Sequence, residues 1–323
     1  MKTSLIIGAG GQDGTLLARY LAGRGDRVIC VDLHRTWQLP SSDENWSPVD
    51  ILRPESTLAL VQKAQADECY YLAAFHHSAE DKSLRPGDLE LFERSHAVNV
   101  RGLLYFLDAI AQSSPRTRLF YAASSHVFGT PATEPQDENT PLNPESIYAI
   151  TKTAGIHCCR HFRNDLGVFA ASGILYNHES CLRTPQFLSQ KIVRGVLAFQ
   201  RDQSQKLVLG DLNTVVDWGF AGDYVEAMAH ILAHQKPEDF VVATGEPHTI
   251  GDFLRITCEI TGVDPQECAV TNPSLLKKKS VRYIGNSEKL RRLTGWRPKT
   301  SFRGIIEQMI EHARKNFKRH FEK

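Results

Sequence analysis

Short apolar runs alternate along the chain with longer segments in which apolar residues recur every three to four positions. Through residue 177 the apolar runs are SLIIGAG, RVICVDL, ECYYLAA, RLFYAAS and VFAASGILYN. Helical spacing lies between them, over residues 12–25, 54–66, 97–112 and 148–166. Such alternation is typical of βαβ units, in which a crossover helix connects each strand to the next parallel one. The pattern predicts an α/β fold with a Rossmann-type doubly wound parallel sheet.

The pattern loosens in the second half of the chain. Predicted helices at 189–199, 223–232, 253–261 and 302–317 accompany one short strand, FVVATG. No repeat or low-complexity linker separates this region from the first 176 residues. We expect residues 1–176 to form a dinucleotide-binding Rossmann domain and residues 177–323 to form a smaller C-terminal substrate lobe, with segments near 215–245 returning to the first domain.

Composition gives the chain no general affinity for polyanions. Its 38 basic and 37 acidic side chains leave a formal net charge of +1, so nothing favours nucleic acid or an anionic membrane as a partner. No apolar stretch is long enough to span a bilayer, and MKTSLIIGAGG lacks the apolar core of a signal peptide. We expect a globular, cytoplasmic protein.

Seven cysteines occur without a repeated CxxC spacing, which argues against both a disulfide framework and a zinc ribbon. One cluster, His157-Cys158-Cys159-Arg160-His161, has a histidine spacing that could place two ligands on one helix face. It lacks a third ligand at a recognisable spacing, so we expect a packed helix and no metal site.

The first predicted strand ends in a glycine-rich turn, GAGGQDG. Gly8, Gly11 and Gly14 follow a GxxGxxG pattern that opens the first helix. Glycines at these positions allow a tight turn and a close approach of a pyrophosphate to backbone N–H groups, where the helix dipole favours negative charge. The turn, including Gln12 and Asp13, is therefore predicted to bind a dinucleotide.

Asp32 ends the second predicted strand, 18 residues after Gly14. Its carboxylate suits the adenosine ribose hydroxyls and would repel a 2′-phosphate, which favours NAD. The neighbouring His34 and Arg35 leave NADP open, because an arginine there could hold that phosphate. The ends of the third and fourth strands are predicted to touch the cofactor through Asp50, Ile51, Leu72, Ala73 and Ala74.

Tyr148 and Lys152 lie four residues apart on one predicted helix face. A nearby cation, helped by a positively charged nicotinamide ring, favours the phenolate and so gives a base that works near neutral pH. The stretch SSHVFG follows an apolar strand and places Ser124, Ser125 and His126 at the predicted mouth of the sheet. We therefore expect catalysis to involve this edge.

Six motifs are distributed over almost the whole chain. They are GQDG in the first turn, YLAA at the fourth strand, Tyr148 with Lys152, GILYNHES at 173–180, LGDLNTVVDWGFAGDYVEAM at 209–228 and LTGWRPKTSF at 293–302. With them the sequence resembles the extended short-chain dehydrogenase/reductase superfamily of NAD-dependent epimerases and dehydratases, and most of all the GDP-mannose 4,6-dehydratase family.

That resemblance implies a bound nicotinamide cofactor and a nucleotide-sugar substrate. It implies that Tyr148 takes the proton from the sugar C4 hydroxyl while hydride passes to the cofactor, with Lys152 and Ser124 assisting. It also implies a homodimer or homotetramer in which helices near 97–112 and 148–166 pair across a two-fold axis.

At His126 the chain departs from that family, which carries a glutamate at this place. In the family the glutamate is thought to remove the C5 proton and to protonate the departing C6 hydroxyl during dehydration. A C4 epimerase needs no such acid, so we expect an epimerase that oxidises its sugar transiently. The alternatives are a 4,6-dehydratase in which His126 replaces the glutamate, an NADPH-dependent keto-sugar reductase, and a non-catalytic cofactor-binding scaffold, which would not need Tyr148 or Lys152.

A second departure concerns the nucleotide. Val215 and Val216 stand where relatives offer a basic residue to the diphosphate. Arg183, Lys191 or the lysines at 277–279 could supply that charge instead, and GDP is the favoured nucleotide. The predicted substrate-binding residues are Ser125, Asn177, Arg183, Phe187 and Lys191.

Overall fold

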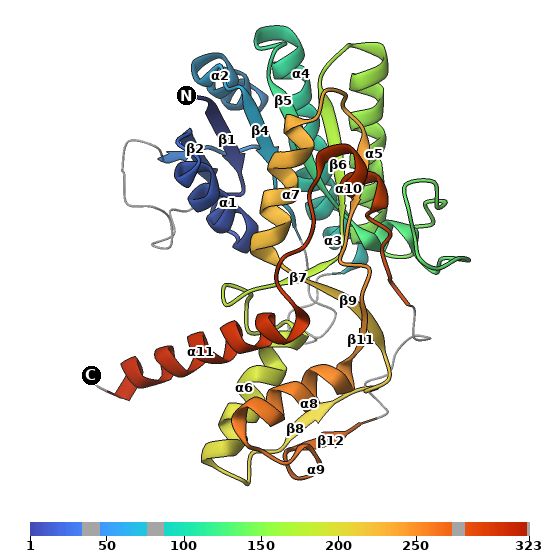
Figure 1. Cartoon of the computed structure of the whole chain (residues 1–323). Helices are drawn as coiled ribbons and strands as arrows, with labels where there is room; N and C mark the ends of the chain where they lie inside the picture. The colour runs from blue at the N-terminus through green and yellow to red at the C-terminus, as the bar shows by residue number, and fades with distance from the viewer. Residues whose placement is uncertain (34–45, 76–86, 273–281, 322–323) are drawn as a thin grey trace.

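A computed structural model describes residues 1–33, 46–75, 87–272 and 282–321 (Figure 1). A large sheet with helices on both faces forms the upper part of the view, and a smaller unit lies below it. Positions 34, 35 and 277–279, which the sequence singles out, lie outside the described residues. Among the described helices, none is long and apolar enough to span a lipid bilayer.

The large sheet consists of seven parallel strands. Their order is β10 (Asp239–Val242), β6 (Ala170–Leu175), β5 (Arg118–Ser124), β4 (Glu68–Tyr71), β1 (Thr3–Ile7), β2 (Arg27–Asp32) and β3 (Trp46–Pro48). The direction of winding reverses between β1 and β4, and the carboxyl ends on either side of such a reversal form the usual ligand-binding crevice. This topology confirms the predicted doubly wound α/β fold.

Helices cover both faces of the large sheet and explain why its strands are continuous apolar runs. One face carries α1 (Gln12–Gly23) and α7 (Ala221–Ala233), and the other carries α2 (Pro54–Ala64), α4 (Leu103–Ser113) and α5 (Ile147–Asp165). The strand residues between them, among them Ile6, Tyr70, Phe120 and Val241, are fully buried.

The helix predicted over 97–112 begins earlier and contains an irregular turn. A helix α3 (Asp88–His96) continues through a π-helical segment, Ala97–Gly102, into α4. Within this wider turn the carbonyl of Val98 accepts a 2.6 Å hydrogen bond from Tyr71 Oη. Gly102 packs against the same phenol, since a Cβ there would lie 2.5 Å from Tyr71 Oη. Apolar periodicity runs through such a turn and does not reveal it.

The smaller unit contains two short sheets. The first pairs β11 (Pro247–Thr249), β9 (Val215–Phe220) and β7 (Asn177–Glu179), and the second pairs β12 (Ala269–Thr271) with β8 (Leu207–Leu209). Around a separate apolar core lie α6 (Leu188–Arg201), α8 (Ile250–Thr261), α9 (Pro265–Cys268) and α11 (Phe302–Phe321). Between β9 and β11 the chain crosses back to the large sheet to add α7 and β10. Strands of three residues are too short for a hydrophobic period to predict them.

Asp217 on β9 connects the two units. Its carboxylate is 1% exposed and accepts hydrogen bonds from the backbone N–H groups of Thr244, Gly245 and Gly285, and from the Thr244 hydroxyl. Burial raises the pKa of Asp217, although these donors act in the opposite direction. The carboxylate thereby fixes β9 to the loop after β10 and to the segment that precedes α10 (Glu288–Thr294).

The cysteines are free thiols, and the histidine cluster lies on α5. There, His161 Nδ1 lies 2.6 Å from Asp165 Oδ2 in an exposed ion pair, while Cys159 is buried. In the described part of the chain, no group of three or more histidine, cysteine or acidic side chains could hold a metal ion.

Candidate active site

The glycine turn packs directly against the end of β4. Gly8 has φ +88°, which side chains rarely adopt, and a Cβ there would lie 2.7 Å from the backbone nitrogen of Ala73. A Cβ at Gly14 would clash with the Gly8 carbonyl, so α1 begins this close to β1 only with glycine. At Gly11 the nearest atom would be 3.5 Å away. The missing side chain of Gly11 thus leaves the N-terminus of α1 open to an anion.

Asp32 stands beside this turn at the end of β2. Its Oδ2 accepts a hydrogen bond from Gly10 N at 2.8 Å, and its Oδ1 accepts one from Leu33 N at 2.8 Å. Each carboxylate oxygen has a second lone pair and so retains the capacity to accept from a ribose hydroxyl. Asp32 therefore holds the glycine turn and keeps the capacity on which the NAD prediction depends.

The other predicted cofactor residues lie at the same edge of the sheet. Leu72 N donates to Ile7 O at 2.9 Å, which extends the pairing of β4 with β1 and brings Ala73 against Gly8. The small side chain of Ala73 leaves room for this contact. The same edge also contains Asp50 and Ile51, just after β3, and Ala74, just after β4.

Ser124 is the last residue of β5, and a 3₁₀ turn, Ser125–Phe128, follows it directly. Ser124 Oγ accepts a hydrogen bond from His126 N at 3.3 Å, which caps this turn. The Ser124 side chain also hydrogen-bonds to the phenol of Tyr148 in the first turn of α5. Ser146 caps α5 by accepting a backbone N–H. Two caps therefore fix Ser124 and Tyr148 relative to each other.

Lys152 is buried one helical turn beyond Tyr148. Its Nζ donates to the Ala122 carbonyl at 2.8 Å and lies 5.7 Å from the centroid of the Tyr148 ring. Burial lowers the pKa of Lys152 to about 7, against an opposing effect of Asp13, and burial raises the pKa of Tyr148 to about 12. The two residues alone therefore do not produce the low phenol pKa expected from their spacing, because desolvation dominates. A low pKa of the Tyr148 phenol would therefore also require the positive charge of a nicotinamide ring.

His126 stacks on Tyr283, a residue that was not predicted from the sequence. The two rings are parallel within 2° at 5.6 Å between centroids, and the His126 ring meets the Tyr148 ring edge-on at 6.2 Å. Tyr283 Oη donates to the carbonyl of Gly129 at 2.7 Å. The imidazole is exposed and is held between Tyr148 on α5 and Tyr283, which lies before α10 and packs against the core of the large sheet. No local motif marks Tyr283, because the contact joins segments that are distant in the sequence.

Four of the five predicted substrate-binding residues lie between β7 and the start of α6, and the fifth, Ser125, follows β5. The Arg183 guanidinium lies 3.7 Å from the centroid of the Phe187 ring, and Arg183 Nε lies 3.5 Å from Glu179 Oε2. Burial is the main effect on the pKa of Tyr148, but the charge of Arg183 acts to lower it. Arg183 therefore lies close enough to Tyr148 for its charge to act on the phenol. Asn177 opens β7, Lys191 lies near the start of α6, Ser125 is buried beside Ser124, and Val215 and Val216 lie on β9.

The side chains of Gln12 and Asp13 reach across to β7. Asp13 Oδ2 lies 2.9 Å from His178 Nε2, and Gln12 Nε2 donates to the His178 carbonyl at 3.1 Å. Ser180 Oγ donates to Gln12 Oε1 at 2.8 Å. His178 is a second residue that was not predicted, although it lies within the NHES motif. Because the side chains of Gln12 and Asp13 are bonded to β7, we expect these residues to contact the cofactor through their backbone N–H groups at the start of α1.

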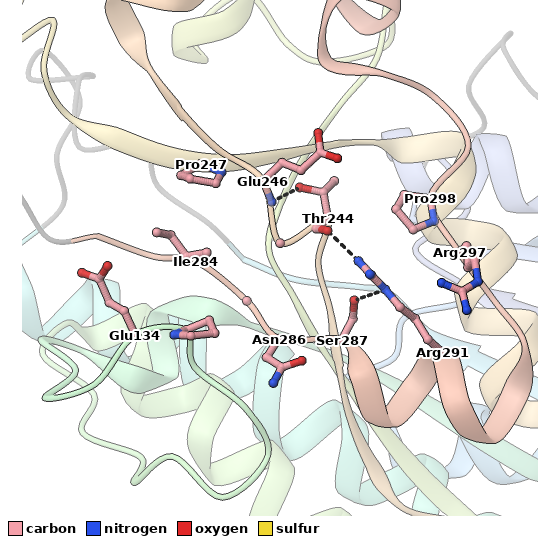
Figure 2. A pocket seen from close by; sticks show the side chains of 13 residues that line it. Glu134, Thr244, Glu246, Pro247, Ile284, Asn286, Ser287, Arg291, Arg297 and Pro298 are labelled. Atoms are coloured by element: carbon pink, nitrogen blue, oxygen red, sulfur yellow. Dashed lines mark hydrogen bonds between the residues drawn. The ribbon is translucent and has the colours of Figure 1, made fainter.

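A cavity of about 820 Å³ lies next to the segment that carries Tyr283 (Figure 2). Ile284 and Gly285 line it, and Arg291 on its wall donates to the Thr244 carbonyl at 2.6 Å. None of the predicted site residues lines this cavity. The mutual contacts of the side chains, and not the volume of a cavity, therefore mark the candidate active site.

Comparison with known proteins identifies the family. The model of the GDP-mannose 4,6 dehydratase family matches residues 5–309. The chain belongs to this family. GDP-mannose 4,6 dehydratase 2 of Arabidopsis thaliana is 32% identical over 96% of this chain and 86% of its own length. The GDP-mannose 4,6-dehydratase of Vibrio cholerae is 28% identical over 99% of this chain and 95% of its own length.

Solved structures show that this dehydratase-family chain shares its fold with several sugar-nucleotide enzymes. Thermus thermophilus UDP-glucose 4-epimerase in complex with NAD has a TM-score of 0.82 at 23% identity, over 97% of this chain and 99% of the other. DesIV, the dTDP-glucose 4,6-dehydratase of Streptomyces venezuelae with NAD and TYD bound, has a TM-score of 0.83 at 21% identity, over 97% of both chains. These likenesses support the fold.

Family membership confirms the resemblance seen in the motifs. The protein is an enzyme of the nucleotide-sugar epimerase and dehydratase type. His126, where a departure from the family is expected from the sequence, lies beside Tyr148.

Proposed function

We propose that this family member is a nucleotide-sugar 4,6-dehydratase in which His126 does the work of the family's glutamate. The observation that carries the proposal is the group formed by the buried Ser124 and Lys152 with the half-buried Tyr148, and with His126 against the Tyr148 ring. Relatives named as GDP-mannose 4,6-dehydratases support dehydration and GDP as the nucleotide. The sugar would pass through a ketone at C4.

The proposed cofactor is NAD. The glycine turn has no room for side chains at Gly8 and Gly14, and Asp32 stands beside it with free lone pairs, so these residues fit a dinucleotide. A carboxylate at Asp32 disfavours a 2′-phosphate, although a fold neighbour, RMD of Pseudomonas aeruginosa, is described as complexed with NADPH. When bound, NAD would accept hydride from C4 and return it at C6.

Tyr148 is the proposed acceptor of the C4 hydroxyl proton, and Ser124 orients it through their hydrogen bond. Because burial holds the pKa of Tyr148 near 12, neighbouring positive charge has to favour the phenolate. Arg183 lowers this pKa, and Lys152 holds its ammonium on the Ala122 carbonyl. The oxidation step should therefore speed up as the pH rises.

His126 is the proposed acid–base group for elimination. A ketone at C4 acidifies the C5 proton, which the imidazole can remove and then deliver to the departing C6 hydroxyl. The exposure of His126 and its fixed position between Tyr148 and Tyr283 support this role.

C4 epimerisation is the second candidate function. The observation that favours it is the lack of a carboxylate at position 126. In that case the C4 ketone would be reduced from its opposite face, and no proton would be exchanged at C5.

We assign the nucleotide sugar to the smaller unit and the cofactor to the large sheet. Arg183 is the proposed partner of the diphosphate, helped by Lys191. Asn177, Ser125 and Phe187 are the other proposed contacts with the substrate. A homodimer through α4 and α5 is also proposed, and the exposed Ile150 on α5 supports it.

The deciding experiment uses GDP-, UDP-, CDP- and dTDP-hexoses in heavy water, with and without added NAD. We expect a 6-deoxy-4-keto sugar that carries deuterium at C5, detected by NMR and mass spectrometry. A C4 epimer without solvent deuterium would establish the second candidate instead. His126→Asn should still form the C4 ketone but lose dehydration by about a hundredfold. Full dehydration by that variant would remove His126 from the proposal.

A further inference from the structure

The glycine turn and β7 of the smaller unit meet in a compact polar junction, defined by Gln12, Asp13, His178 and Ser180. Three hydrogen bonds cross it, one from each of the His178 ring, the Gln12 amide and the Ser180 hydroxyl. The Gln12 amide also donates to Asp13 Oδ1 at 3.1 Å. In Figure 1, β7 lies at the level where the large sheet meets the smaller unit. This junction therefore connects the predicted pyrophosphate turn to the proposed substrate unit.

Hydrogen-bond chemistry fixes the protonation of the His178 ring. Nδ1 lies 2.7 Å from the Tyr176 carbonyl, which can only accept, so Nδ1 carries a proton. Nε2 lies 2.9 Å from a carboxylate oxygen of Asp13, which accepts as long as it is ionised. Two acceptors facing two ring nitrogens require an imidazolium. Burial acts against both charged forms, yet the mutual attraction raises the pKa of His178 and lowers that of Asp13.

The charge of Asp13 acts on the pKa values of Tyr148 and Lys152. It acts to raise the pKa of Tyr148 and that of Lys152, in each case beside the larger effect of burial. An unpaired Asp13 carboxylate would thus oppose the phenolate on which oxidation depends. An imidazolium at His178 offsets that charge from the other unit of the molecule.

We propose that His178 is a positioning residue which, as an imidazolium, holds Asp13 and the glycine turn against β7 and screens the Asp13 carboxylate from Tyr148. It acts through Asp13 and touches no reacting atom. The charged and titratable groups that face it are Asp13 from α1, Arg183 from the loop after β7, and Tyr224 from α7, which stacks on the His178 ring at 4.8 Å. Arg183 opposes the imidazolium, and Asp13 outweighs it.

The first test reads the ring itself by NMR of protein labelled with ¹⁵N-histidine. His178 should carry protons on both nitrogens at pH 7, and Asp13→Asn should lower its pKa and leave it neutral at that pH. A neutral His178 ring in the unsubstituted protein at pH 7 would overturn the proposal. Because this readout needs no substrate, it stands even if the proposed dehydratase reaction is wrong.

The second test measures NADH binding by fluorescence, followed by the pH dependence of sugar oxidation, which rests on the proposed function. His178→Asn should weaken NADH binding roughly tenfold, the loss expected for a charged hydrogen bond. It should move the pKa that limits oxidation upward, because the Asp13 carboxylate loses its counter-charge, while Asp13→Asn removes both charges and should leave that pKa close to its original value. No upward shift for His178→Asn would leave His178 a packing residue only.

A matched control is available on the surface. His161→Asn removes a histidine from an exposed pair with Asp165 and should change neither NADH binding nor the pH profile. If His178→Asn fails to fold, Asp13→Asn still serves, because an asparagine amide can donate to the unprotonated Nε2 of the neutral ring and so keeps a hydrogen bond without the charge.

Discussion

The carboxyl edge of the large sheet and its junction with the smaller unit are built differently. At the edge, the groups come from continuous motifs: the glycine turn, and Tyr148 with Lys152 on one helix. At the junction, Asp13 meets His178 from a distant part of the sequence, and at the edge His126 likewise stacks on the distant Tyr283. In the proposed reaction the edge supplies Tyr148 and His126 as the reacting groups, and the contacts between distant segments position them and adjust their charge. Substitutions at the edge should therefore abolish turnover, whereas those at the junction should change rates and pH dependence more mildly.

Removal of the Tyr148 hydroxyl should have the largest effect. Tyr148→Phe should lower kcat/KM for the sugar by about 10³-fold, because the C4 hydroxyl loses its proton acceptor. Steady-state kinetics measure this, and Tyr105→Phe on α4 is the control, since Tyr105 lies outside the candidate site. If Tyr148→Phe kept more than a tenth of the activity, the edge would not supply the base.

Loss of the Lys152 ammonium should cost about 10²-fold in kcat/KM and should also change the pH dependence of stability. Burial lowers the pKa of Lys152 from 10.5 to about 7, so between these pH values the unfolded chain binds a proton that the folded chain does not. The free energy of unfolding should therefore rise with pH over this range. Lys152→Met should remove that rise in urea titrations at pH 7 and pH 9. An unchanged slope would place the folded-state pKa of Lys152 near its ordinary value.

Beside His126, the ring of Tyr283 should matter more than its hydroxyl. Tyr283→Ala should lower the rate of dehydration roughly tenfold, because His126 loses the ring against which it stacks. Tyr283→Phe keeps the stack, and we expect less than a threefold change in product formation followed by NMR. If both variants lost the same fraction of the dehydration rate, the hydrogen bond from the Tyr283 hydroxyl to the Gly129 carbonyl, and not the stacked ring, would be what matters.

The last expected effect is on the free energy of unfolding, through the Asp13–His178 pair. The contribution of Asp13, whose pKa is lowered, is present above 3.8 and is lost as the pH falls through its folded-state pKa. The contribution of His178, whose pKa is raised, is present below 6.5 and is lost as the pH rises through its folded-state pKa. His178→Asn should therefore lower the free energy of unfolding by about 1–3 kcal/mol, mainly between pH 4 and 6.5.

Chemical denaturation at pH 5.5 and pH 9 measures this difference. The same His161→Asn control should show a change below about 0.5 kcal/mol at both values, because its pair is exposed. A difference for His178→Asn that grew toward pH 9 would have the wrong sign for an imidazolium.

Local patterns were enough to predict the large sheet and the residues at its edge. Apolar runs identified six of its seven strands because both faces are buried, whereas the three-residue β3 shows no such run. The glycines revealed a turn that excludes side chains at Gly8 and Gly14. The roles expected for those residues remain predictions. Spacing did not reveal the environment of Tyr148, because its pKa depends on burial by the whole fold.

Local sequence patterns did not predict the strands of the smaller unit or the contacts at the junction. Three-residue strands such as β7 show no period, and the partners of His126 and Asp13 lie far away in the sequence. Tyr283 and His178 were missed because each acts through a tertiary contact. The wide turn at Ala97–Gly102 was missed because it preserves the apolar spacing of the helices on either side.

Asn99, which is fully buried in that wide turn, has a consequence for how firmly the helix that carries Tyr148 is held. Its Oδ1 accepts from Phe75 N at 3.0 Å, and its Nδ2 donates to Thr151 Oγ1 at 3.0 Å on that helix. One amide thereby joins the backbone just after β4, the wide turn and α5 at a single buried point. Removing the amide, as in Asn99→Ala, would take a hydrogen-bond partner from both neighbours at once.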